Sequence, residues 1–168
     1  MKMIFRILFL VSIFYSCNTK EANYTKVIVE NGVFSKSIIK TLTEPDKMLL
    51  LGYLFTYGNE CDETSTKIKC QILTEFSIDN ECETAHIENL KKWFVKEDLL
   101  KYKLNKCPSL PIKAAIQNDI KKIVLRKDKD TLSINFSVIG MNTSQEKNWD
   151  IEVVKKYLVK NKMFIPLN

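Results

Sequence analysis

Glycine and histidine are scarce in this sequence, whose 168 residues include four glycines and one histidine. The glycines, at positions 32, 52, 58 and 140, are scattered, so no Gly-rich loop is present to cradle a phosphate or a dinucleotide. A Cys-His or Ser-His-Asp mechanism could use only His86, which lies two residues after Thr84 at an expected helix start. The sequence therefore predicts a protein that is not an enzyme and carries no cofactor.

Closely spaced cysteine pairs are also lacking. Cys61, Cys70, Cys82 and Cys107 are separated by 8, 11 and 24 residues, which fits neither a structural zinc site nor a redox Cys-x-x-Cys motif. Acids alternate at positions 79, 81 and 83, but without the glycine-containing loop typical of calcium sites. We therefore expect no metal site. An enzyme that combines His86 with these acids is the least favoured alternative.

The first 17 residues have the layout of an export signal. A short basic head precedes an apolar run that ends at Ser16-Cys17, and this run is shorter than the roughly 20 residues that span a bilayer. The segment resembles the bacterial lipoprotein class, in which a small residue precedes a cysteine that is lipidated and becomes the mature N-terminus. The resemblance implies a signal peptide over 1–16 and lipidation of Cys17. It also implies a cell-envelope location, lipid-anchored at the outer membrane on its periplasmic side or surface.

The rest of the chain has the length of one domain. We expect a short tether over 17–24 and a single globular domain over 25–168. Without residues 1–16 the chain has 24 basic and 20 acidic residues, with the acids concentrated in 59–88 and the bases after residue 89. A basic face could contact lipid or glycan. Nucleic acid is not an expected partner, because arginine and interleaved aromatic residues are lacking.

Acylation of Cys17 would leave four cysteines, which in an oxidising compartment predict two disulfides with three possible pairings. Helices over 65–76 and 84–95, packed as a hairpin, would bring Cys107 towards Cys61 and Cys82 towards Cys70. Joining Cys82 to Cys107 would bridge the ends of a helix about 18 Å long, too far for a disulfide. We therefore predict Cys61–Cys107 and Cys70–Cys82, which staple the segment 58–108, with a local Cys61–Cys70 bond as the alternative.

Hydrophobic periodicity predicts helices in the first two thirds of the chain. Residues 24–42 are ambiguous, and we prefer a short helix from about Phe34 to a strand around Val27–Val29. Thr43 and Pro45 begin an apolar core helix that Gly58 ends. Two more helices follow over 65–76 and 84–95, and one further turn is expected over 114–117.

The last third reads as sheet, with strands at 123–125, 132–139, 149–154 and 163–167 and bulges at Gly140 and Val154. The predicted fold class is therefore α+β, in which three to four N-terminal helices precede a curved antiparallel β-meander of about four strands.

A disulfide-linked domain that carries a cluster of acidic residues and no recognisable catalytic residues is typical of a module that binds another protein. We expect a non-catalytic protein-binding or inhibitory module, similar in character to immunity proteins, whose partner is an envelope or secreted protein. An envelope-maintenance factor that binds lipid or glycan is the alternative. The candidate contact residues are Trp93, Phe94, Glu60, Asp62, Glu63, Asp79, Glu81 and Glu83. Core packing is the alternative use of the two aromatic residues.

Overall fold

The computed structural model describes residues 23–57, 67–78, 84–97, 104, 116–142 and 144–167. These residues form a six-stranded antiparallel sheet, in the order β2-β1-β3-β4-β5-β6, and four helices. The strands are β1 (Tyr24–Glu30), β2 (Val33–Phe34), β3 (Ile116–Asp128), β4 (Thr131–Asn142), β5 (Lys147–Lys160) and β6 (Met163–Leu167). The helices are α1 (Lys36–Ile39), α2 (Glu44–Thr56), α3 (Ile68–Glu75) and α4 (Thr84–Trp93).

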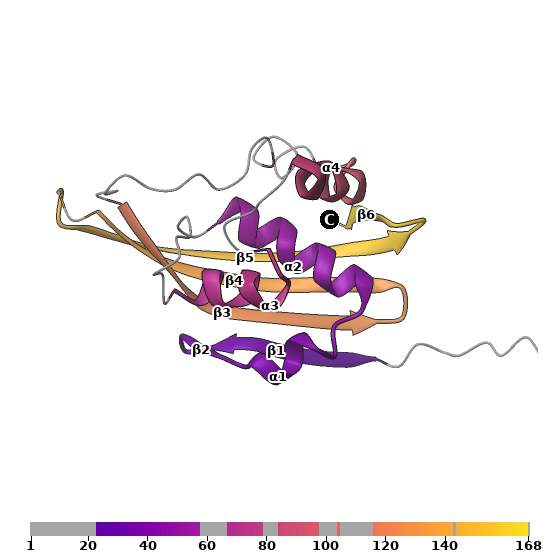
Figure 1. Cartoon of the computed structure of the whole chain (residues 1–168), viewed down its shortest axis with the longest axis horizontal. Helices are drawn as coiled ribbons and strands as arrows, with labels where there is room; N and C mark the ends of the chain where they lie inside the picture. Colours follow the sequence, from indigo (N-terminus) through magenta and orange to yellow (C-terminus); the bar gives the residue numbers. More distant parts are fainter. Residues whose placement is uncertain are drawn as a thin grey trace, which may run out of the picture.

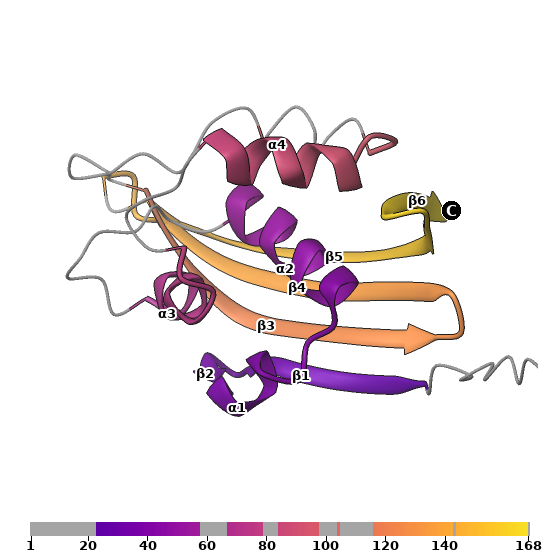
Figure 2. The same cartoon turned by 45° about the vertical axis from the view of Figure 1, so that its right-hand side comes forward.

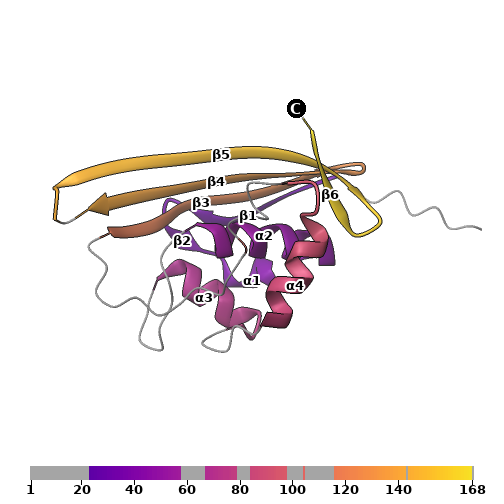
Figure 3. The ribbon, with the colours of Figure 1, turned by 90° about the horizontal axis from the view of Figure 1, so that it is seen from above.

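All four helices lie on the same side of the sheet, which Figure 3 shows edge-on. In Figures 1 and 2, α2 crosses the middle of the sheet, α4 lies over its β5–β6 side, and α3 and α1 lie over its β3 and β1 side. The hydrophobic core fills the space between these layers. The sheet therefore has one covered face and one open face, on which no described helix packs.

The predicted fold class is wrong because the domain begins in the sheet. β1 precedes every helix and pairs with β3, a strand almost 100 residues later in the chain. Asn31 and Gly32 both have positive φ, so they form the two-residue turn that joins β1 to β2. The expected N-terminal helices thus follow two strands, and the expected four-stranded meander is part of a six-stranded sheet.

The core helix is confirmed. Thr43 accepts a hydrogen bond from the Asp46 backbone N–H (3.5 Å), while Asp46 Oδ2 accepts one from the Thr43 N–H (3.0 Å), which completes a capping box. α2 is buried from Leu49 to Phe55. The expected helices at 65–76 and 84–95 correspond to α3 and α4, and the short helix after Phe34 to α1.

The strands of the C-terminal third lie where the alternation of apolar and polar residues predicted them. The two predicted bulges, in contrast, are wrong. Register runs unbroken through Gly140 and Val154, and instead shifts between Val27 and Val29 and between Ile120 and Lys122. Gly140 is opposite Trp149, and a Cβ at Gly140 would lie 2.0 Å from the indole ring. The glycine therefore makes room for a tryptophan rather than for a bulge. The helical turn expected at 114–117 is wrong for residues 116–117, which begin β3.

A buried carboxylate ties β1 to α2. The Asp46 side chain is fully buried, and it accepts hydrogen bonds from the Tyr24 hydroxyl (2.6 Å) and the Lys26 ammonium (2.7 Å). Burial, and then the hydrogen bond to Asp46, raise the pKa of Tyr24. Tyr24 was expected to end the tether, but it is the first residue of β1, and the preceding Asn23 accepts a hydrogen bond from the Lys129 N–H (3.0 Å). The domain therefore includes residues 23 and 24.

Candidate binding surface

The covered face of the sheet is occupied by aromatic side chains. Trp93 and Phe94 are 3% and 0% exposed, and their rings lie 5.1 and 4.9 Å from that of Phe164. Both candidate anchors are therefore part of the core, and neither is available to a partner. Their burial follows from α4 lying across the β5–β6 side of the sheet.

A hydrogen-bonded pair of tyrosines is enclosed in the same layer. The hydroxyl oxygens of Tyr53 and Tyr157 are 2.8 Å apart, and the Tyr157 hydroxyl also donates to Glu97 Oε2 (3.5 Å). Burial is the main cause of the raised pKa of Tyr53 and of Tyr157, and Glu97 raises both further. Both phenols therefore stay protonated at neutral pH. Since the two side chains are almost completely buried, this pair stabilises the fold rather than forming a reactive site.

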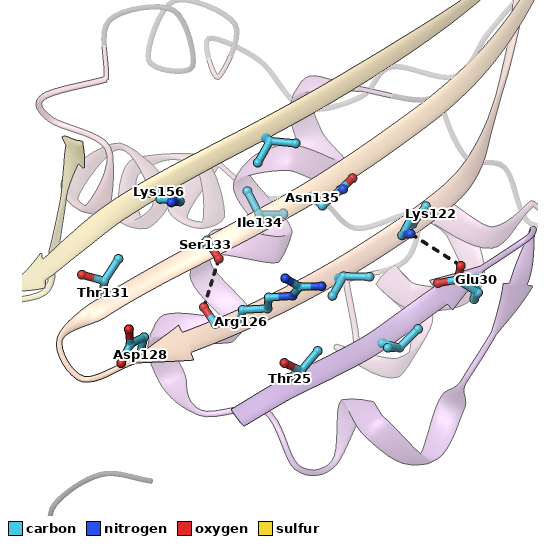
Figure 4. Close-up of a pocket in the computed structure, with 13 residues that line it drawn as sticks. Thr25, Glu30, Lys122, Arg126, Asp128, Thr131, Ser133, Ile134, Asn135 and Lys156 are labelled. Atoms are coloured by element: carbon cyan, nitrogen blue, oxygen red, sulfur yellow. Dashed lines mark hydrogen bonds and ion pairs between the residues drawn. The ribbon is translucent and has the colours of Figure 1, made fainter. Parts of the chain in front are cut away.

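The open face combines polar and apolar side chains, and a groove of about 460 Å³ runs across β1, β3, β4 and β5. Figure 4 shows the side chains that line the groove, together with the buried Ile134 of β4. The lining side chains of the open face are Thr25, Val27, Glu30, Lys122, Val124, Arg126, Asp128, Thr131, Ser133, Asn135, Val154 and Lys156. In β3, β4 and β5 they come from alternate positions, as residues that share one face of a sheet must. In β1 the register shift between Val27 and Val29 changes the phase, so Glu30 follows Val27 after three residues.

Short contacts fix several of these side chains. Lys122 lies 3.6 Å from Glu30 across β1 and β3, and Ser133 donates to the Arg126 carbonyl (3.3 Å), as Figure 4 shows. Asn135 donates from Nδ2 to Glu152 (3.1 Å), while its enclosed Oδ1 accepts no hydrogen bond from the described residues. The groove thus combines paired charges with hydroxyl and amide groups, an arrangement that suits a polar ligand.

A second hollow of about 450 Å³ continues the open face towards the far end of β5. Asp150 lies 3.7 Å from Lys121 and accepts a hydrogen bond from Ser137 (3.4 Å). Glu152 lines the same hollow. The basic residues of the two hollows therefore lie on β3 and at Lys156 of β5, and a pair of acids, Asp150 and Glu152, lies further along β5.

Most of the residues singled out from the sequence lie outside the described ranges. These are Cys17, Cys61, Cys82, Cys107, Glu60, Asp62, Glu63, Asp79, Glu81 and Glu83. Cys70 is buried on α3 and is disulfide-bonded, but the two predicted pairings stay predictions because the other cysteines fall outside these ranges. His86 is partly buried on α4.

Within the described part of the chain, no cluster of three or more His, Cys, Asp or Glu side chains could hold a metal ion, and no helix is long and apolar enough to cross a membrane.

Sequence reasoning missed the open face because it treated the alternation in β4 only as a sign of burial. The polar half of that alternation, at Thr131, Ser133, Asn135 and Ser137, identifies the side chains that face away from the core. Which strands lie beside β4, and so complete the groove, depends on the pairing of β1 with β3. No local pattern carries that long-range contact.

No protein-family model matches the chain, and no curated protein or solved structure is significantly similar to it. Its function therefore has to be inferred from its own residues.

Proposed function

We propose that this protein is a non-catalytic binding or inhibitory module that is anchored at the bacterial cell envelope through Cys17. The module binds an envelope or secreted protein on the open face of its sheet. With Cys17 as the lipid anchor, β1 would begin seven residues later, within about 25 Å of the membrane. The domain would then meet partners close to the envelope surface.

One observation carries the proposal: a six-stranded sheet whose described helices all lie on one face, with a groove of mixed polar and apolar side chains on the other. Hydroxyl and amide groups, salt-bridged charges and the exposed apolar Val154 alternate along this groove. Mixed polar and apolar surfaces of this kind are typical of protein interfaces. The described residues, in contrast, bring together no nucleophile, base and oxyanion donors.

Lipid or glycan remains the second candidate ligand, and the charge distribution argues against lipid. An anionic bilayer attracts a surface that is basic throughout. On the open face, Arg126 and Lys122 alternate with Glu30 and Asp128, and the hollow beside them carries Asp150. Such a pattern favours a partner whose own charges alternate, which a folded protein can supply.

The test is capture of a partner from envelope extract by the full-length protein. Arg126→Glu reverses a charge in the groove. Lys92→Glu is the control, because it makes the same charge change at an exposed residue of α4, on the other side of the sheet. We expect one stoichiometric protein to be captured by the wild type and by Lys92→Glu, and its affinity for Arg126→Glu to be about tenfold lower, because like charges then meet in the groove.

Two results would contradict the proposal. One is retention of lipid or glycan without a protein in a defined ratio. The other is equal loss of capture in the two variants, which would show that net charge rather than the groove controls binding.

A further inference from the structure

β6 pairs with only five of the 14 residues of β5, the last long strand of the sheet. β5 pairs with β4 from Lys147 to Leu158, whereas β6 pairs with β5 only over Lys156–Lys160. Across residues 147–155, the outer side of β5 pairs with no strand of the described chain. Figures 1 and 2 show this part of β5 continuing well past β6.

The hydrogen-bond pattern identifies the backbone groups on this edge. The Val159 N–H donates to the Asp130 carbonyl (2.9 Å), on the β4 side of β5. In an antiparallel ladder, residues alternate between the two sides of a strand. The N–H and C=O groups of Asn148, Asp150, Glu152 and Val154 therefore point outward, and the side chains of these residues lie on the open face.

The two edges on this side of the sheet differ. β6 carries Pro166 opposite Tyr157, a residue that bonds to β4, so the proline occupies an outward-pointing position without an N–H to offer. Proline and bulges are common devices that prevent an edge strand from pairing. The uncovered part of β5 has neither, because it contains no proline and its register with β4 is unbroken. β6 is thus protected, whereas neither a proline, a bulge nor another strand of the described chain blocks pairing at this part of β5.

We infer that the edge of β5 over residues 147–155 binds an extended strand of the partner protein, which adds to the sheet by β-augmentation. This inference rests on the proposed function and names the mode of binding. Asp150 and Glu152 on the open face select basic residues on that side of the incoming strand. Ile151, which is 38% exposed, lies on the opposite side and selects an apolar residue there. The occupant is therefore a strand that alternates basic and apolar residues.

A second copy of the chain is a poorer occupant. When two β5 edges pair antiparallel with their sheet faces aligned and Ile151 near the centre, Asp150 or Glu152 of one copy lies opposite Asp150 or Glu152 of the other. Like charges directly opposite one another destabilise a strand pair. The acids that attract a basic strand thus also oppose self-association through this edge.

The experiment titrates the full-length protein with two capped 11-residue peptides, one alternating lysine and valine and the other alternating glutamate and valine. We expect the lysine peptide to bind and to slow hydrogen exchange at the N–H groups of Asp150, Glu152 and Val154. The N–H groups of Ile151 and Val153 already bond to β4, so their exchange is the internal control. Glu152→Pro removes one outward N–H and is expected to lower affinity about fivefold or more.

Glu152→Lys tests the charge preference in a strand that keeps all its N–H groups. It is expected to weaken the lysine peptide and to strengthen the glutamate peptide. Equal affinity of the wild type for both peptides would overturn the inference. So would concentration-dependent protection of the same three N–H groups without peptide, which would identify a second copy as the occupant.

Partner capture separates this inference from the proposed function. Capture that is lost in Arg126→Glu but unchanged in Glu152→Pro and Glu152→Lys would overturn the strand inference and leave the proposed function standing. If the wild-type protein binds the lysine peptide but captures no partner, the result would support strand binding at the β5 edge and overturn the proposed function.

Discussion

The two faces of the sheet are built from alternate residues of the same strands, and they have opposite properties. In β4, Leu132, Ile134, Phe136 and Val138 are buried beneath the helices, while Thr131, Ser133 and Asn135 line the groove of the other face. A single residue step along the strand thus separates the core from the surface. The comparison shows how one short segment can contribute stability and recognition at the same time.

Stability and recognition are therefore expected to respond to different substitutions. Changes on the covered face remove packing and should lower the free energy of unfolding, because buried side chains contribute by the apolar area withdrawn from water. Changes on the open face should leave that free energy almost unaltered and act on partner binding.

The largest effect is expected at Phe136, which is fully buried and whose ring lies 5.8 Å from that of Tyr53 and 5.7 Å from that of Tyr57. Phe136→Ala leaves a cavity under α2 and should lower the free energy of unfolding by about 3–5 kcal/mol. Ser133→Ala, on the other face of the same strand, should change it by less than about 0.5 kcal/mol. Urea denaturation measures both. Similar losses in the two variants would contradict the division between the faces.

A smaller effect is expected at the buried tyrosine pair, and it depends on pH. The unfolded chain releases tyrosine protons near pH 10, whereas burial raises the pKa of Tyr53 and Tyr157 in the folded state. The stability that each contributes is therefore complete below pH 10 and falls above it, by about 1.4 kcal/mol per pH unit for each tyrosine.

Tyr53→Phe removes one of these groups and its hydrogen bond to Tyr157. We expect it to lower the free energy of unfolding by about 1 kcal/mol at pH 7 and to reduce the slope above pH 10 by about 1.4 kcal/mol per unit. Denaturation curves of both proteins between pH 8 and 11.5 measure the two slopes. Parallel slopes would show that Tyr53 ionises in the folded state as it does in the unfolded chain.

Local features of the fold were predictable from the sequence wherever one short segment contains the whole signal. Thr43, Pro45 and the apolar run after them predicted α2, and the alternation from Leu132 to Val138 predicted β4. The turn at Asn31-Gly32 carries an equally local hairpin signal, but a short helix from about Phe34 was preferred to a strand around Val27–Val29. That error, more than any tertiary effect, displaced the start of the sheet.

Other features depend on contacts that no short segment contains. Gly140 looked like a bulge because its partner, Trp149, lies on another strand. The sequence left both partner contact and core packing open for Trp93 and Phe94, and only the neighbouring β6 explains why both rings are buried. The open groove likewise requires β1 to join β3. These contacts are tertiary, and their residues have no distinctive local pattern.

The smallest expected effect compares two neighbouring valines of β5. Val153 packs against the core, whereas Val154 is 59% exposed on the open face and lines the groove. Val153→Thr should lower the free energy of unfolding by about 1 kcal/mol, because it places a hydroxyl against apolar side chains. Val154→Thr makes the same change of atoms and should alter stability by less than about 0.5 kcal/mol, yet weaken partner capture. Denaturation and capture on the same two proteins test both halves of this expectation. If Val154→Thr lost as much stability as Val153→Thr while capture was unchanged, the open face would belong to the core of a larger assembly rather than to a binding surface.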